Sequence, residues 1–349
     1  MRRKGLKVRE LSVVFRQLAD ALQGGLSLRD AAAILAKISR GEREESKALL
    51  QRWIEVLEKG SPMSAALALD PKLFPPETVS MVRDAEQREA LPDVLAMVAK
   101  DLEFRAELST GMQGVMAWPA FAAGFLVLIL MITMIFVIPT YKDLFKSFGA
   151  DLPGPTIALI WLSDFVASYF YLVFLAAIAA VVYGFVRGFS LARLPWLDDV
   201  AIRLPFLRDY LRHTFTVRLA QVLALAGRER VPVGPALAYL RATAGNRNLG
   251  AVARSLEAHL ADGKDLVGAL WDAPLVPREL AAAVEISLRG GNVAGAMDRV
   301  AAFSEAEAAR SLLGFQQAVM FAMYVAIGAV VGLVVIAMYL PIFKMGSAI

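Results

Sequence analysis

The residues of this chain that could perform chemistry are few and stand apart from one another. His213 and His259 are the only histidines, and neither is flanked by the carboxylates that a metal site needs. Cysteine is absent, which removes disulfides, thiolate metal ligands and cysteine nucleophiles. We therefore predict no metal, no cofactor and no catalytic residue, and we assign both histidines structural or surface roles.

Two glycine-containing segments could suggest phosphate binding, but neither has the required pattern. Gly263 and Lys264 are followed by Asp265, where a phosphate loop needs Ser or Thr, and the upstream glycine is missing. A second glycine group follows no predicted strand, so its members are interpreted as turn residues: Gly290, Gly291 and Gly295. This chain is not predicted to bind nucleotide through such a loop.

One charged residue and one glycine pair lie within apolar segments. Asp164 could relay protons or bind an ion, but a spanning helix can begin after it, which places Asp164 at the outer membrane interface. Gly328 and Gly332 form a GxxxG pattern that lets a second helix approach closely. That pattern fits packing within the chain or a dimer contact.

Three long apolar runs surround these residues, and 57% of the chain is hydrophobic. The runs are Val115 to Ile138, Ile157 to Val186 and Ala318 to Leu340, each long enough to cross a hydrocarbon layer of ~30 Å as a helix. We predict three transmembrane helices. The basic amino terminus is not followed by a short apolar core, so we predict no cleavable signal peptide.

The layout of the chain repeats with a nearly constant offset. Pro139 and Pro341 are 202 residues apart, as are Glu103 and Glu305. Such an offset predicts a duplication of a charged segment followed by an apolar run. Lys and Arg residues gather beside the charged segments, so the positive-inside rule predicts that both segments face the cytoplasm.

Apolar residues in the charged segments recur at helical spacing, and helix-start signals lie between the stripes. Ser27 with Asp30 resembles a capping box, and Asp265 is positioned as a helix cap. The fold class is therefore an all-α membrane protein with two repeated cytoplasmic bundles of about six helices each. Lys and Arg nearly balance Asp and Glu in both segments, so we predict no nucleic-acid partner.

The predicted order of domains alternates between the two sides of the membrane. It consists of a first cytoplasmic bundle (1–112), a crossing (113–139), a periplasmic loop (140–156), a second crossing (157–187), a linker with the second bundle (188–312), a third crossing (313–341) and a periplasmic tail (342–349).

Several motifs resemble those of the inner-membrane platform proteins of type II secretion systems and type IV pili. The most specific match is the loop from Phe148 to Thr156, with the sequence FGADLPGPT. The other motifs are Phe15 to Ala19 before Gly24-Gly25, Gly60 to Leu67, Phe74-Pro75, Trp118-Pro119 and Val137 to Pro139. The resemblance covers Leu11 to about Pro341, and the beginning of the chain is similar to short type IVb pilus members.

The family's Gly-Glu-x-x-Gly segment is incomplete in both copies. It is written AEQRE at 85–89 and SLRGG at 287–291, so each copy keeps only part of it. This departure puts the local role of the segment in doubt.

The resemblance implies a non-enzymatic platform that couples a cytoplasmic hexameric ATPase to the extraction of pilin or pseudopilin from the bacterial inner membrane. It also implies contacts with other inner-membrane assembly proteins and lipid, and a homo-oligomer, with a dimer favoured. As candidates for ATPase contact or self-association we name the polar residues near the membrane, and for helix packing the two glycines: Glu103, Arg105, Glu305, Arg310, Gly328 and Gly332.

Two rival functions stay open at this stage. A small transporter or channel would use Asp164 and the paired glycines along a path, although no second ionisable residue lies in the membrane. A membrane enzyme would need a convergent nucleophile, base or metal set, and the sequence offers none that can be named.

Overall fold

The computed structural model describes residues 8–38, 44–147, 154–169, 172, 203–228 and 231–346 of the chain. Every regular element in these ranges is a helix. The chain divides into two compact units. Unit 1 comprises Met1–Thr110 and Leu191–Leu312, and unit 2 comprises Gly111–Ser190 and Leu313–Ile349.

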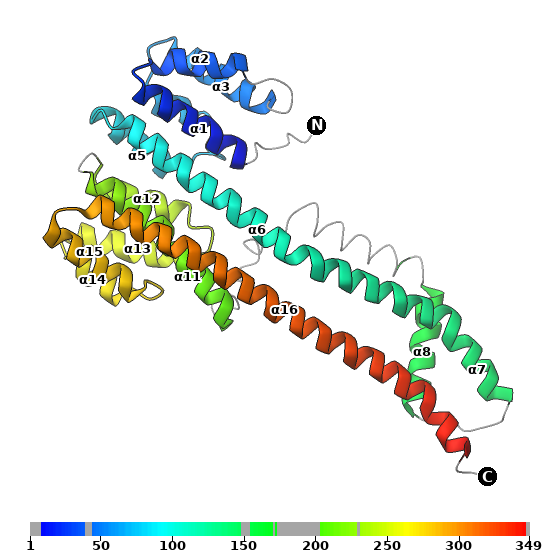
Figure 1. Ribbon diagram of the computed structural model, residues 1–349. Helices are drawn as coiled ribbons and strands as arrows, with labels where there is room; N and C mark the ends of the chain where they lie inside the picture. Colours follow the sequence, from blue (N-terminus) through cyan, green and yellow to red (C-terminus); the bar gives the residue numbers. More distant parts are fainter. Residues whose placement is uncertain are drawn as a thin grey trace. The chain divides into compact units, whose positions relative to one another are not determined.

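The first half of unit 1 packs around three aromatic rings. Its helices are α1 (Val8–Gln23), α2 (Leu28–Ile38), α3 (Glu44–Leu57), α4 (Met63–Ala68), α5 (Pro76–Gln87) and the start of α6 (Leu91–Ile132) (Figure 1). Trp53 from α3 is fully buried between Phe15 and Phe74, with ring centroids 6.0 Å away in both cases. These short helices are marginal by themselves, so their stability depends on burying this shared apolar face.

The second half of unit 1 surrounds a buried central helix. It contains α11 (Pro205–Gly227), α12 (Val233–Ala242), α13 (Arg247–Ala261), α14 (Leu266–Asp272), α15 (Arg278–Gly290) and the start of α16 (Val293–Gly346). In Figure 1, α12 to α15 gather around α11 and the amino-terminal part of α16. Residues from 214 to 225 of α11 are all buried, so this helix is covered on every side.

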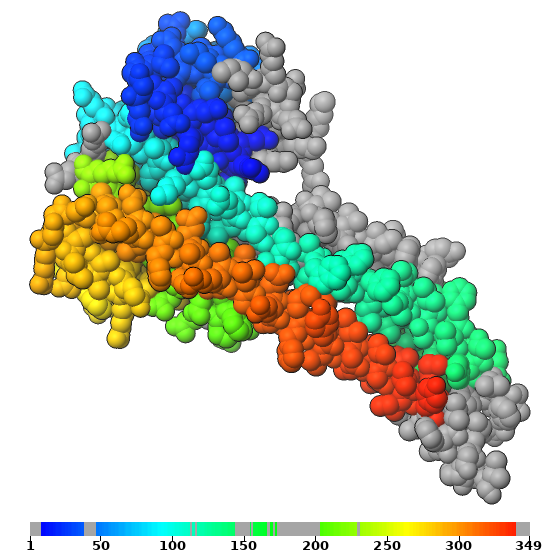
Figure 2. Space-filling view, viewed as in Figure 1, coloured from blue at the N-terminus to red at the C-terminus, as the bar shows by residue number. Residues whose placement is uncertain are grey.

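Unit 1 has one continuous hydrophobic core to which both halves contribute, from Phe15 and Trp53 to Phe215 and Leu280. Figure 2 shows side chains of α6, in cyan, directly against those of α16, in orange. In agreement, Lys100 Nζ of α6 lies 3.8 Å from an oxygen of Asp298 on α16.

The spacing seen in the sequence recurs in the backbone of unit 1. Gly60 and Gly263 both have positive φ, at 75° and 70°, and each stands shortly before a short helix. Pro75 and Pro277, 202 residues apart, are the N-cap residues of α5 and α15. The predicted caps are also present, because Asp30 N donates to Ser27 Oγ, and Asp265 accepts from Val267 N and Gly268 N.

The glutamate of the Gly-Glu-x-x-Gly segment is present in the first copy and missing in the second for a local physical reason. In the first half, Glu86 accepts from the backbone N–H groups of Met63 and Ser64, because the N-cap of α4 is Pro62, whose side chain cannot accept a hydrogen bond. In the second half, Asp265 caps α14 from within the chain segment itself. The position 202 residues after Glu86 is Leu288, which has no carboxylate. The second half does not need one there, because Asp265 already caps α14.

Glu89 occupies a glycine-type conformation at the end of the same segment. Its φ is 57°, whereas the corresponding residue 202 positions later is Gly291, with φ 73°. The left-handed conformation costs a non-glycine residue ~1–2 kcal/mol, more than the ~0.5–1 kcal/mol entropy cost of glycine. Glu89→Gly is therefore expected to stabilise the protein by roughly 0.5–1 kcal/mol, measured by chemical unfolding of the full chain in detergent.

A matched control for Glu89→Gly uses an exposed glutamate in a helix. Glu55 lies within α3, where glycine is unfavourable, so Glu55→Gly should destabilise the protein by about 1 kcal/mol. Equal destabilisation by both variants would show that the conformation of residue 89 carries no cost.

Unit 2 contains the apolar part of α6, the π-helical segment η2 (Thr133–Val137), α7 (Ile138–Ser147), α8 (Gly154–Ser168) and the apolar part of α16. Its small core draws on η2, α7, α8 and α16, through Met134, Ile138, Leu159, Val334 and Ala337. Two hydroxyl groups support the packing, since Thr156 Oγ1 donates to Ala337 O at 2.7 Å and Ser163 donates to Met134 O.

The π-helical segment ends at Val137, two residues before Pro139. Proline lacks the N–H that an α-helix needs for its bond to the residue four positions earlier, and single π turns accommodate such interruptions. Helical structure continues beyond Pro139 through α7, and beyond Pro341 to Gly346.

Two of the described helices are long and apolar enough to cross a membrane, Ala117–Asp143 and Val293–Tyr339. They contain most of the first and most of the third predicted crossing. Most of the second, Ile157 to Val186, lies outside the described residues, as does most of the Phe148 to Thr156 loop. The three-crossing topology and the predicted domain boundaries therefore stay predictions.

Candidate interaction site

A buried ionic cluster joins the two halves of unit 1. Asp101 of α6 and Arg218 of α11 are 2% and 5% exposed, and their Oδ1 and Nε atoms are 2.5 Å apart. The Tyr239 hydroxyl of α12 donates to Asp101 Oδ2 at 2.6 Å. One carboxylate of the first half thus meets two residues that lie more than a hundred positions later in the chain.

The remaining donors of the cluster are also used. Arg218 Nη1 donates to Thr243 O at 2.9 Å, and Nη2 donates to Thr243 Oγ1 at 2.6 Å. Arg105 Nη1 lies 3.5 Å from Asp101 Oδ2 on the side nearer to solvent. A buried charge pair is tolerated when its remaining hydrogen-bonding groups are satisfied, as they are here.

Burial and charge act in opposite directions on the ionisable groups of the cluster. Burial by itself raises the pKa of Asp101, but the charges of Arg218 and Arg105 and two hydrogen bonds outweigh it, so the net pKa lies below its ordinary value. Burial, followed by the negative charge of Asp101, raises the pKa of Tyr239. The carboxylate is therefore ionised and the phenol neutral across the physiological range.

More exposed ion pairs border the cluster along the junction. Arg241 of α12 lies 3.3 Å from Glu77 of α5 and 2.8 Å from Glu257 of α13. Arg228 lies 3.7 Å from Asp93. Partly exposed pairs of this kind each contribute little, so the buried cluster dominates the electrostatics of the junction.

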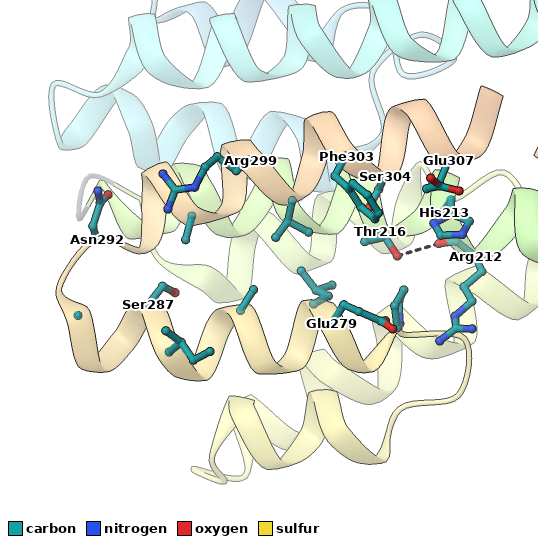
Figure 3. A pocket seen from close by; sticks show the side chains of 17 residues that line it. Arg212, His213, Thr216, Glu279, Ser287, Asn292, Arg299, Phe303, Ser304 and Glu307 are labelled. Carbon is teal, nitrogen blue, oxygen red and sulfur yellow. Dashed lines mark hydrogen bonds between the residues drawn. The ribbon is translucent and has the colours of Figure 1, made fainter. Parts of the chain in front are cut away.

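A groove opens in the second half of unit 1, between α11, α15 and α16, with a volume of about 780 Å³. Figure 3 shows Phe303 and Glu307 on α16, with His213 and Thr216 on α11. Burial is the largest cause that lowers the pKa of His213, which favours a neutral imidazole in this groove.

The predicted site residues of the first half take part in contacts within the chain. Glu103 accepts from Arg16 Nε at 3.0 Å and thereby ties α6 to α1. Arg105 belongs to the edge of the buried cluster. The structure therefore gives both residues a positional role inside unit 1, and it leaves about a third of each side chain exposed.

The predicted residues of the second half are more open. Glu305 is exposed on α16, and Arg310 pairs with Glu307 at 2.6 Å while its side chain stays 74% exposed. In the described part of unit 2, a Cβ added to Gly328 or Gly332 would meet no atom within 4 Å. Both glycines are thus accessible for contact with another helix.

Other residues singled out in the sequence lie far from a shared centre. His259 Nδ1 lies 2.7 Å from Ser255 O in α13, away from the groove that His213 lines. Asp164 of α8 pairs with Lys142 of α7 at 2.7 Å, so its charge has a partner inside unit 2. Among the described residues, no three His, Asp or Glu side chains gather as a metal site would require.

Sequence reasoning did not identify Asp101, Arg218 or Tyr239. A signal was present, because Asp101 shares the helical stripe of Val94, Val98 and Leu102, where a charge is out of place. Arg218 likewise interrupts an apolar stretch of α11. A charge on an apolar helix face indicates a buried partner, but its identity depends on tertiary packing.

Fold and site together define a helical protein with one charged unit, whose two halves are joined by ion pairs, and with two described helices that are long and apolar enough to cross a membrane. Residues 14–139 and 219–341 both match the family described as "Type II secretion system (T2SS), protein F". The chain belongs to this family, which is a component of secretion and pilus machinery in the bacterial inner membrane.

Similar curated proteins come from both kinds of machinery. The type IV pilus assembly protein TapC of Aeromonas hydrophila is 26% identical, over 99% of this chain and 83% of that protein. The type IV pilus assembly protein PilC of Thermus thermophilus is 28% identical, over 98% and 84%. The type II secretion system protein F of Pseudomonas aeruginosa is 28% identical, over 99% and 85%.

Proposed function

We propose that this chain is a non-enzymatic platform of the inner membrane, which couples a cytoplasmic hexameric ATPase to the extraction and assembly of pilin or pseudopilin subunits. The observation that carries this proposal is that two segments match one secretion family, and each combines charged helices with a long apolar helix. The names of the similar pilus assembly and secretion proteins support the same role.

Extraction of a pilin needs energy that this chain is not equipped to release. Removing a helix of about 20 apolar residues from lipid opposes ~1.5–3 kcal/mol for each large apolar side chain. ATP hydrolysis in a partner supplies that energy, and the platform transmits it. Helices α6 and α16 suit this task because each contributes residues to both units with no loop between them.

In this proposal, both halves of unit 1 face the cytoplasm and unit 2 lies in the lipid. Unit 1 engages the ATPase, and the apolar helices contact the pilin or pseudopilin and other inner-membrane assembly proteins. Gly328 and Gly332 of α16, where an added Cβ would meet no atom within 4 Å, offer a close-packing surface for a helix of such a partner. The platform acts as a homo-oligomer, with a dimer favoured.

The test separates ATPase contact from internal pairing at Glu103. Glu103→Arg places two arginines together, so we expect surface pili or secretion to fall by at least about tenfold for either reason. The double variant Arg16→Glu/Glu103→Arg restores an ion pair between α1 and α6 but reverses both exposed charges. If Glu103 also contacts the ATPase, the double variant stays defective and no longer co-purifies with the ATPase.

Membrane insertion, protein level and co-purification with the ATPase are measured for each variant. Full recovery of assembly in the double variant would limit Glu103 to internal pairing and remove it from the ATPase surface. The coupling role itself would be contradicted if the unsubstituted protein failed to associate with the pilus or secretion ATPase of the same cell.

A further inference from the structure

The groove between α11, α15 and α16 has an unusual amount of exposed apolar surface at its rim. Phe303 is 62% exposed and Ile286 is 71% exposed. Figure 3 shows Phe303 extending from α16 toward the space between α15 and α11. Exposed apolar residues that line a groove between packed helices mark an interaction site more often than solitary ones do.

A corresponding cleft, with a volume of about 340 Å³, lies in the first half of unit 1. Between Pro75 and Arg105, five lining positions of that cleft recur in the groove at an offset of 202 residues: Pro75 and Pro277, Thr78 and Leu280, Val98 and Val300, Leu102 and Ser304, and Arg105 and Glu307. The opposite wall of the first cleft is supplied by α12 and the residues after it, with Tyr239, Ala242 and Thr243. The groove is therefore the second copy of a cleft beside which α12 packs against α5 within the chain.

The helix that corresponds to α12 in the first half is α2. When Leu28 is aligned with Val233, the first residue of each helix, three buried positions coincide: Ala31 with Ala236, Ala32 with Leu237, and Leu35 with Leu240. Under this alignment Ile34 corresponds to Tyr239. Tyr239 is 2% exposed against the first half, whereas Ile34 is 45% exposed.

Both partners of this contact are polar within the chain, and both related residues are apolar. Within the chain, the Tyr239 hydroxyl donates to buried Asp101. The positions related to them are Ile34 and Phe303, two exposed apolar residues. When Leu18 of α1 is aligned with Leu219 of α11, both fully buried, Arg218 corresponds to exposed Gln17, so the charge is absent together with the carboxylate it would neutralise.

We propose that the groove of one chain receives the α1–α2 face of a second copy, so that Ile34 of one copy packs against Phe303 of the other. This inference goes beyond coupling to an ATPase and does not depend on it. In a dimer the contact is made twice, since each copy offers one groove and one α1–α2 face and each groove receives the face of the other copy. It repeats between molecules the packing that joins the two halves within one molecule, with an apolar pair in place of the polar one.

The absence of cysteine allows a direct test in the membrane. Ile34→Cys and Phe303→Cys are introduced into separately tagged full-length chains, which are co-expressed and treated with a short bifunctional maleimide. We expect a cross-linked species that carries both tags when one chain has Ile34→Cys and the other has Phe303→Cys. Chains that all carry the same substitution should give little product. Preferential cross-linking between two chains with the same substitution, or no cross-linking in any pair, would overturn the proposal.

A second test introduces an ion pair at the same contact, in case a single variant folds poorly. Phe303→Arg should weaken self-association of the purified protein in detergent by at least about tenfold, because a charge would enter an apolar contact. Leu288→Arg is the matched control, since Leu288 is 55% exposed on α15 but does not line the groove, and it should leave association unchanged. Adding Ile34→Glu to Phe303→Arg should restore association, which repair of a folding defect would not explain.

Native mass spectrometry and light scattering measure association, and circular dichroism checks the helix content of each variant. Unchanged association of Phe303→Arg, or no recovery in the double variant Ile34→Glu/Phe303→Arg, would assign the groove to another partner or to none.

Discussion

Asp101→Ala is expected to destabilise the protein by about 3–5 kcal/mol. The substitution leaves the Arg218 guanidinium buried without its carboxylate, and the Tyr239 hydroxyl loses its acceptor. Removing one partner of a buried pair costs more than the pair contributes, because the remaining charge has lost its hydration as well. Chemical unfolding of the full chain in detergent, followed by circular dichroism, measures the change.

A double-mutant cycle provides the control for this prediction. Arg218→Ala should cost a similar amount, because it strands the carboxylate of Asp101. The double variant Asp101→Ala/Arg218→Ala should cost far less than the two single changes together, since no unpaired charge stays buried. Additive losses would contradict the buried ion pair as the cause.

The same cluster predicts how stability depends on pH. Because the pKa of Asp101 is lowered in the folded protein, its stabilisation is complete above the ordinary pKa of about 3.9 and is lost as the pH falls through the folded value. The raised pKa of Tyr239 acts at the other end, where stability is lost as the pH rises above about 10. Unfolding measured across this range should show a shallower acid limb in Asp101→Asn.

Trp53→Ala is expected to cost about 3–5 kcal/mol through the loss of a large buried side chain. Trp53 is fully buried and contacts Phe15 and Phe74, which come from different helices and loops of the first half. Alanine would leave a cavity at the point where α1 and α3 meet. The free energy of unfolding and the near-ultraviolet circular dichroism signal should both fall.

Two tryptophan variants serve as controls for this cavity. Trp53→Phe keeps an aromatic ring and removes an indole N–H that has no partner among the described residues, so it should cost under about 1.5 kcal/mol. Trp271→Ala removes a tryptophan that is 44% exposed on α14, and it should cost under about 1 kcal/mol. A loss at Trp271 as large as that at Trp53 would contradict burial as the cause.

The features that sequence predicted well are those with short-range causes. Asp265 was expected to be a helix cap and is one, because a cap needs only the backbone groups two and three residues ahead. The first and third apolar runs were expected to be long helices, since hydropathy over some 20 residues suffices to recognise them. The family was also identified from the sequence, through short motifs whose residues are neighbours along the chain.

Patterns along the sequence predicted the candidate site only in part. Glu103 and Arg105 were selected as surface residues, but the structure shows that they contact Arg16 and Asp101. The spacing of Glu103 and Glu305 suggested equivalent roles. Arg16 pairs with Glu103, whereas the residue related to it, Val217, is fully buried in the core, so the two glutamates have different surroundings.

The sequence by itself determined that this chain is helical, has long apolar segments and repeats its layout at intervals of 202 residues, because these properties depend on neighbours along one helix or on a simple comparison of positions. Only the tertiary structure decided that Asp101, Arg218 and Tyr239 form one buried cluster, and that α12 forms a wall of the cleft in the first half, whereas among the described residues no corresponding helix lines the groove of the second half. Which charge is neutralised and which apolar face is covered depends on how helices pack across more than a hundred residues of chain, and helical periodicity carries no information about that pairing.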